Sequence, residues 1–390
     1  MGPLHAQGIE HYWRAFADES SAPFCLQRTL PPAFRKQLIA ESHAPQYGVR
    51  DPRELPRDLR SDRWQAMCDA LESWSDLSRE RQCRLALLMH ALCLYEPLQQ
   101  LVPPDNLPTC GDDPGAAELA YWKAAGRYAL GLPNRMSQYG HADMSGFEQI
   151  LLRAPDAVPA AINATLKIFV HKAKTGASLG ELAAWRERAE AALAHAVSRL
   201  DAFTAGLLTS RYYRAIGFIP QRCGEKAEVV RIMDLAEKHA RGLKPGTEAE
   251  GLLYSENLHP VLESRTKEAL WLGDADLALQ RAQAVVELDR YDSKTWAELG
   301  EVAMKRKEWS AAADAYVVAA TLGPPASAVG RYMAGVCYRE LGKERLAAFF
   351  FKDALEVDPL GISSRNALCE LPDAAVMDAL KEWNFSTITL

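Results

Sequence analysis

Several common functional signals are missing from the 390-residue sequence. The eight cysteines include no CxxC pair, so we expect reduced thiols and not a disulfide framework or a cysteine-rich metal site. The most apolar run, from Leu85 to Leu98, is too short to cross a bilayer and predicts one buried core helix. The sequence also contains no nucleophile elbow, zinc-protease motif, phosphate-binding loop or dinucleotide fingerprint, which removes the best-known signatures of enzymes.

Strong charge of one sign is also missing. The formal net charge is -6, and the longest cationic run is only Lys305 to Lys307. A nucleic-acid partner is therefore not expected, because such proteins carry extended basic patches. The segment from Met1 to Gln7 lacks the charged and apolar blocks of a signal peptide. We expect a cytoplasmic location and no insertion into a membrane.

A repeated spacing, by contrast, is clearly present between Ser293 and Pro359. Large apolar residues, glycine, small alanine, aromatic residues and proline recur at matching offsets 35 residues apart. The first copy contains Trp296, Leu299, Gly300, Ala312, Tyr316, Ala319 and Pro324, and the second contains Gly335, Tyr338, Ala347, Phe351, Ala354 and Pro359. Such self-similarity indicates a repeat architecture.

This pattern resembles the tetratricopeptide (TPR) repeat, with departures at Ala303, Arg331 and Ala334. The resemblance implies two antiparallel helices per repeat, which stack because one hairpin cannot bury both of its faces. A preceding degenerate repeat is expected over residues 259–292, where Gly273 and Ala278 keep the turn and small positions. Members of this family mostly bind other proteins, so the resemblance implies a binding role.

The remainder of the chain shows helical periodicity and no strand signature. We predict an all-α fold, an α-solenoid of stacked helical hairpins, in three parts: an irregular N-terminal helical domain (1–144), a middle helical array (145–258) and TPR-like repeats with C-terminal capping helices (259–390). Serine or threonine three residues before glutamate predicts capping boxes. These are Ser145 with Glu148, Ser178 with Glu181, and Thr247 with Glu250. Pro260 is expected to break the helix that follows the third box.

The first helix of each TPR hairpin lines a concave groove, and the resemblance assigns groove positions in this sequence. The partner-binding candidates are Trp271, Glu298, Glu301, Met304, Tyr332, Met333 and Arg339. Aromatic residues and methionine are enriched at interfaces. The competing interpretation is that Trp271 and Tyr332 pack against the chain itself, either its N-terminal half or its C-terminal tail.

Two sites for chemistry are weighed against this binding role. The long loop Gly131–Met144 contains Arg135, His141 and Asp143, which could supply acid–base catalysis and an anion contact. This loop supports the alternative hypothesis, an enzyme or small-molecule sensor with its site in the N-terminal half. Cys83, His90 and Cys93 share one expected helix, but apolar neighbours favour burial in the core over metal binding. No catalytic residue, cofactor or metal is expected in the main interpretation.

The function that these patterns favour is binding of another protein or an extended peptide segment. Such a protein would act as a cytoplasmic adaptor, co-chaperone or assembly factor through its concave groove. A stoichiometric protein partner would favour this hypothesis, whereas a small ligand that co-purifies with the protein would favour the enzyme or sensor.

Overall fold

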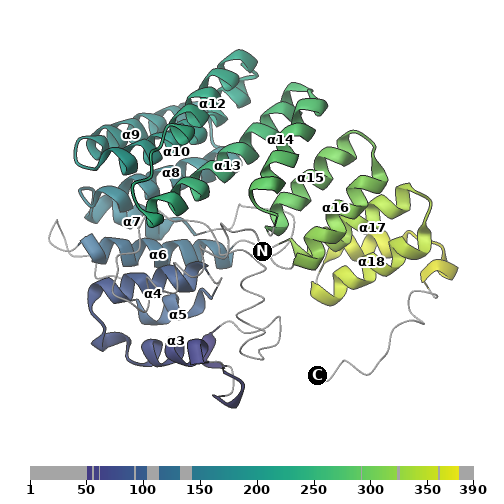
Figure 1. The fold of residues 1–390 in the computed structure, drawn as a ribbon, viewed down its shortest axis with the longest axis horizontal. Helices are drawn as coiled ribbons and strands as arrows, with labels where there is room; N and C mark the ends of the chain where they lie inside the picture. The colour runs from purple at the N-terminus through teal and green to yellow at the C-terminus, as the bar shows by residue number, and fades with distance from the viewer. Residues whose placement is uncertain are drawn as a thin grey trace. The chain divides into compact units, whose positions relative to one another are not determined.

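The structure is a computed structural model in which every regular element of the described residues is helical. It describes residues 51–54, 57–60, 62–91, 94–102, 114–131, 143–290, 292–322, 326–358 and 361–376. The all-α prediction is thereby confirmed, and the fold is an α-solenoid of stacked helical hairpins (Figure 1). The first 50 residues of the irregular N-terminal domain expected over 1–144 lie outside these ranges.

The chain forms two compact units, and the division falls inside one helix, between Ser264 and Arg265. The three-part division expected from the sequence remains a prediction. Unit 1 contains the 3-10 helices η1 (Pro52–Glu54), η2 (Arg57–Leu59) and η3 (Trp74–Asp76). Its α-helices are α3 (Asp62–Glu72), α4 (Arg79–Ala91), α5 (Glu96–Leu101), α6 (Pro114–Gly131), α7 (Ser145–Arg153), α8 (Val158–Lys174), α9 (Leu179–Val197), α10 (Ala202–Ile216), α11 (Phe218–Cys223), α12 (Lys226–Arg241) and the first part of α13 (Glu248–Leu272).

One continuous apolar core holds unit 1 together. Consecutive helices pack against each other from α6 through α10, and α10 then packs against α12. Trp64, Trp122, Phe147 and Phe169 are fully buried in this core. Aromatic side chains of this size contribute much of the apolar area that stabilises a helical fold.

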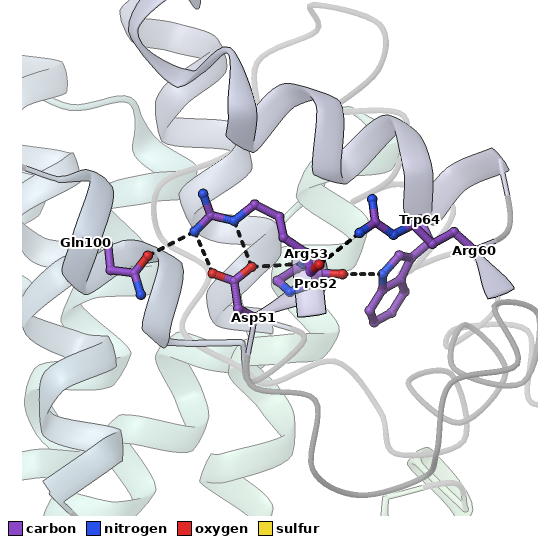
Figure 2. A network of polar contacts seen from close by, with 6 residues as sticks. All are labelled: Asp51, Pro52, Arg53, Arg60, Trp64 and Gln100. Atoms are coloured by element: carbon purple, nitrogen blue, oxygen red, sulfur yellow. Dashed lines mark hydrogen bonds and ion pairs between the residues drawn. The ribbon is translucent and has the colours of Figure 1, made fainter. Parts of the chain in front are cut away.

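A polar network fastens the start of the described chain to two helices of unit 1 (Figure 2). Arg53 donates to both carboxylate oxygens of Asp51, at 2.9 and 2.6 Å, and to Gln100 of α5 at 3.0 Å. Trp64 of α3 donates its indole N–H to the carbonyl of Pro52 at 2.8 Å. These bonds hold η1 against both helices and satisfy the buried indole nitrogen.

One of the three predicted capping boxes is confirmed in full, at Thr247, and at Ser178 the described residues show only the N-cap hydrogen bond. Ser178 Oγ accepts from the N–H of Glu181. The Thr247 hydroxyl accepts from the N–H of Glu250, and the Glu250 carboxylate accepts in return from the N–H of Thr247. The box at Ser145 is wrong, because Ser145 is the first residue of α7 and its own N–H donates to Asp143 Oδ1 at 2.8 Å.

Proline acts differently from expectation at two places. The single core helix expected over Leu85–Leu98 is divided, since α4 ends at Ala91 and α5 begins at Glu96 with Pro97 in its first turn, where proline is favoured. Pro260, in contrast, does not break α13, which runs from Glu248 to Leu272. Burial of Val261 and its neighbours offsets the lost backbone bond, and tertiary packing overrides the local preference.

Unit 2 is a stack of helical hairpins (Figure 1). It contains the remainder of α13, then α14 (Ala275–Leu288), α15 (Ser293–Lys305), α16 (Trp309–Leu322), α17 (Ser327–Glu340), α18 (Glu344–Val357) and α19 (Ile362–Cys369). Each helix from α14 to α19 packs on the next, with small apolar clusters between them. None of the helices in the described ranges is long and apolar enough to cross a membrane.

Candidate functional site

The repeat spacing places a glycine of the first helix in close contact with an aromatic ring of the second helix. A Cβ atom added to Gly300 of α15 would lie 2.9 Å from the ring of Tyr316 of α16. A Cβ on Gly335 of α17 would lie 2.6 Å from the ring of Phe351 of α18. Both distances are shorter than a van der Waals contact, so only glycine leaves room for the ring. The 35-residue register inferred from the sequence is therefore present in three dimensions.

The turns inside the hairpins define a third repeat. Gly273, Lys307 and Gly342 all have positive φ, at 89°, 63° and 69°. In each turn this residue donates to the carbonyl three residues back, and the next residue donates to the carbonyl five residues before itself. This bond pair is the Schellman motif that ends a helix with a left-handed residue. Its recurrence at intervals of 34 and 35 residues confirms the hairpin of α13 and α14 that the sequence indicated weakly.

Three apolar groove candidates come from three successive first helices. Trp271 of α13, Met304 of α15 and Met333 of α17 are each half-buried. Met304 and Met333 pack against the apolar cluster between α15, α16 and α17. Trp271 belongs to no apolar cluster of the described residues. We call these three side chains the groove stripe.

The two acidic groove candidates differ in whether they form an ion pair. Glu298 of α15 forms an ion pair with Lys267 of α13, and its side chain is 17% exposed. Glu301, one turn further along α15, is exposed and forms no ion pair with the described residues. Glu301 therefore remains available for a basic group, whereas Glu298 already neutralises a lysine from the neighbouring repeat.

The last two groove candidates contact the C-terminal helices of unit 2. Tyr332 of α17 is half-buried, and its ring centroid lies 5.7 Å from that of Phe351. Arg339 donates to Glu370 at 3.1 Å, and its guanidinium carbon lies 5.9 Å from the Phe351 ring centroid. These contacts give both side chains a role within the stack, next to the groove stripe.

The alternative site near the loop 131–144 is described only at Asp143, because Arg135 and His141 lie outside the described residues. Asp143 accepts the N–H of Ser145 at 2.8 Å and pairs with Arg127 Nη1 at 3.3 Å. These hydrogen bonds lower the pKa of the Asp143 carboxyl, and those from Ser145 have the largest effect. A carboxylate held in this way orients the start of α7.

Cys83 and His90 each have neighbours in the core of unit 1, and Cys93 lies outside the described residues. The thiol of Cys83 is buried and lies 3.4 Å from the carbonyl oxygen of Gly115. The His90 ring contacts Trp122, with 5.1 Å between centroids. Burial, with a smaller effect from Lys167, lowers the pKa of His90 to about 3, so this imidazole is neutral at pH 7.

Comparison with known proteins supports the fold and leaves the family open. No protein-family model matches the chain, and no curated protein matches it in sequence. Among solved structures, the human IFIT1 dimer with PPP-AAAA is similar at 9% identity and a TM-score of 0.50, over 82% of this chain and 71% of that one.

Two further solved structures match with lower TM-scores. YrrB, described as a TPR protein with an unusual peptide-binding site, has 16% identity and a TM-score of 0.35, over 58% of this chain and 98% of its own. The APC/C hetero-tetramer Cut9–Hcn1 has 14% identity and a TM-score of 0.27, over 80% and 70%. At such identities a likeness concerns the fold alone. The hairpins of unit 2 are TPR-like by their own geometry.

Proposed function

We propose that unit 2 binds an extended peptide segment of a partner protein along the groove stripe. The observation that carries this proposal is Trp271, a half-buried indole outside every apolar cluster of the described residues. Met304 and Met333 continue the stripe with adaptable apolar side chains, and a deep aromatic anchor carries much of an interface's energy. The similarity of the hairpins to TPR repeats also supports this function, by analogy at the level of the fold.

The charges beside the stripe suggest the chemistry of the segment. Glu301 is exposed and not paired with the described residues, so a lysine or arginine in the segment would be complementary to it. Glu298 adds less, because Lys267 already neutralises it. The favoured ligand is therefore a segment with large apolar residues and one basic residue. An adaptor, co-chaperone or assembly factor in the cytoplasm would use such a groove.

Selection of random peptides displayed on phage against the full-length protein tests this proposal. The selected peptides should combine apolar residues with a basic residue, and Trp271→Ala should weaken their binding about thirtyfold, a loss of about 2 kcal/mol. Phe349→Ala is the matched control, because Phe349 is an exposed aromatic residue of α18, on a second helix and not a groove position. Glu301→Lys should remove the preference for a basic residue.

The proposal is wrong if the selected peptides bind Trp271→Ala as tightly as the native protein. Melting temperatures separate binding from folding. Trp271→Ala is expected to melt close to the native protein, whereas Tyr332→Ala should melt lower because its ring packs on Phe351. A large loss of stability in Trp271→Ala would show that the indole fills the core.

A further inference from the structure

Unit 1 carries a basic cluster that the groove of unit 2 does not explain. Helices α8 and α10 lie side by side (Figure 1). Arg211 and Arg214 lie three residues apart on α10, which places them on one helix face. Arg211 Nη1 donates to Asn163 Oδ1 of α8 at 3.3 Å, and Lys167 follows Asn163 one turn later on α8.

Arg214 is the unusual member of this cluster. Its Nε atom is buried and has no hydrogen-bond partner, while the side chain as a whole is half-buried. A buried guanidinium normally receives a carboxylate or several carbonyl oxygens, because an unsatisfied buried charge is costly. Arg214 is therefore a half-buried arginine whose buried Nε atom lacks an acceptor.

The charged neighbours of Arg214 do not neutralise it. Burial lowers its pKa first, and the positive charge of Arg211 lowers it further. Glu263 of α13 acts in the opposite direction, but it forms no ion pair with Arg214, and its Oε1 lies 3.2 Å from Nδ1 of His259. The positive charge of Arg211 thus acts on Arg214 more strongly than the negative charge of Glu263, an arrangement that an anion would stabilise.

We propose that Arg211 and Arg214 form a binding site for a phosphate-bearing ligand on the α8–α10 face of unit 1. A guanidinium offers paired N–H donors in the geometry that phosphate oxygens accept, so the two arginines can hold one phosphate group from two sides. Asn163 of α8 positions the Arg211 guanidinium.

The first experiment measures calorimetric binding of inorganic pyrophosphate to the full-length protein. The native protein should bind it, and Arg214→Met should lose at least about tenfold in affinity, as expected for a hydrogen bond to a charged group. Arg231→Met is the matched control, because Arg231 lies on α12, is exposed and pairs with Glu228 at 2.6 Å. Its affinity should equal that of the native protein.

A second measurement separates binding from folding and phosphate from other anions. Without ligand, Arg214→Met should melt at or above the native temperature, because it removes an uncompensated charge; Arg214→Lys, which keeps the charge, should retain part of the affinity. No binding by the native protein, or equal binding by Arg214→Met, would overturn the site. Equal affinity for citrate would overturn the assignment to phosphate.

Discussion

The protonation state of a buried side chain in this protein depends more on its neighbours than on its own chemistry. Glu118 of α6 shows this, because it is half-buried and accepts one hydrogen bond from the indole N–H of Trp122 at 3.2 Å. Burial raises the pKa of the Glu118 carboxyl from 4.5 to about 7. The same environment keeps His90 neutral, since burial lowers its pKa to about 3.

Glu118→Gln should therefore change how stability depends on pH. Between the ordinary pKa of 4.5 and the folded pKa of about 7, the folded protein binds more protons at Glu118 than the unfolded chain does. Native stability falls as pH rises through that window. Glutamine stays neutral and keeps the acceptor for Trp122, so the variant should be about 3 kcal/mol more stable at about pH 8 and unchanged at about pH 4. Urea unfolding at both pH values measures this, and an equal effect at both would contradict it.

At this scale the sequence identified the side chains that fill repeat positions but not those that depend on distant contacts. Gly300, Ala312 and Tyr316 were found from their spacing, because each must meet a fixed neighbour in the same hairpin. Arg214 gave no signal, since the acid that acts on it comes from helix α13, which is distant in sequence. The ion pair of Glu298 with Lys267 joins two repeats, and the spacing of residues within one repeat did not predict it.

In the hairpin turns of unit 2, local conformational preferences explain the backbone geometry. Gly273 and Gly342 carry the left-handed residue at hairpin turns, as glycine allows without steric cost. Lys307 occupies the equivalent position with φ of 63°, where a residue with a Cβ is disfavoured. Its side chain is exposed and forms no ion pair with the described residues.

Lys307→Gly should stabilise the protein by about 0.5–1 kcal/mol, because relief of the left-handed strain exceeds the extra entropy of glycine in the unfolded chain. The reciprocal change, Gly342→Lys, should destabilise it by a similar amount, since no atom lies within 4 Å of a Cβ at Gly342 and only the backbone is strained. Denaturant unfolding of the two variants checks the opposite signs. A loss of stability in Lys307→Gly would show that the lysine side chain matters more than its backbone.

A second prediction concerns the seam between α15 and α16. Ala312 is completely buried, whereas Ala311 beside it on α16 is exposed. Ala312→Leu should cost about 1–3 kcal/mol through overpacking, and Ala311→Leu should be nearly neutral. Thermal melts of the two variants compare them directly, and equal melting temperatures would contradict the seam.

Proline marks the limit of prediction at the scale of elements. The break between α4 and α5 follows the local rule, with Pro97 in a first turn. Pro260 violates it, because α13 continues through a residue that cannot donate to the previous turn. Neighbours such as Val261 are fully buried, and the sequence alone does not reveal burial that distant helices supply.

At the scale of the whole molecule, left-handed glycines also end helices where no repeat was visible in the sequence. Gly176 and Gly224 of unit 1 also have positive φ, at 86° and 75°. They lie 48 residues apart, and Gly273 follows Gly224 after 49 residues. The helices of unit 1 lack the TPR residue pattern, so only their helical nature could be predicted from the sequence.

The close contact between a glycine and an aromatic ring in these hairpins limits how this sequence can diverge. A side chain cannot appear at Gly300 unless the ring at Tyr316 becomes smaller, and Gly335 and Phe351 are bound by the same constraint. Related sequences should therefore show correlated substitutions at positions sixteen residues apart, in both copies. Descent would preserve the pair as one inherited unit even where the surrounding surface, and whatever it binds, has changed.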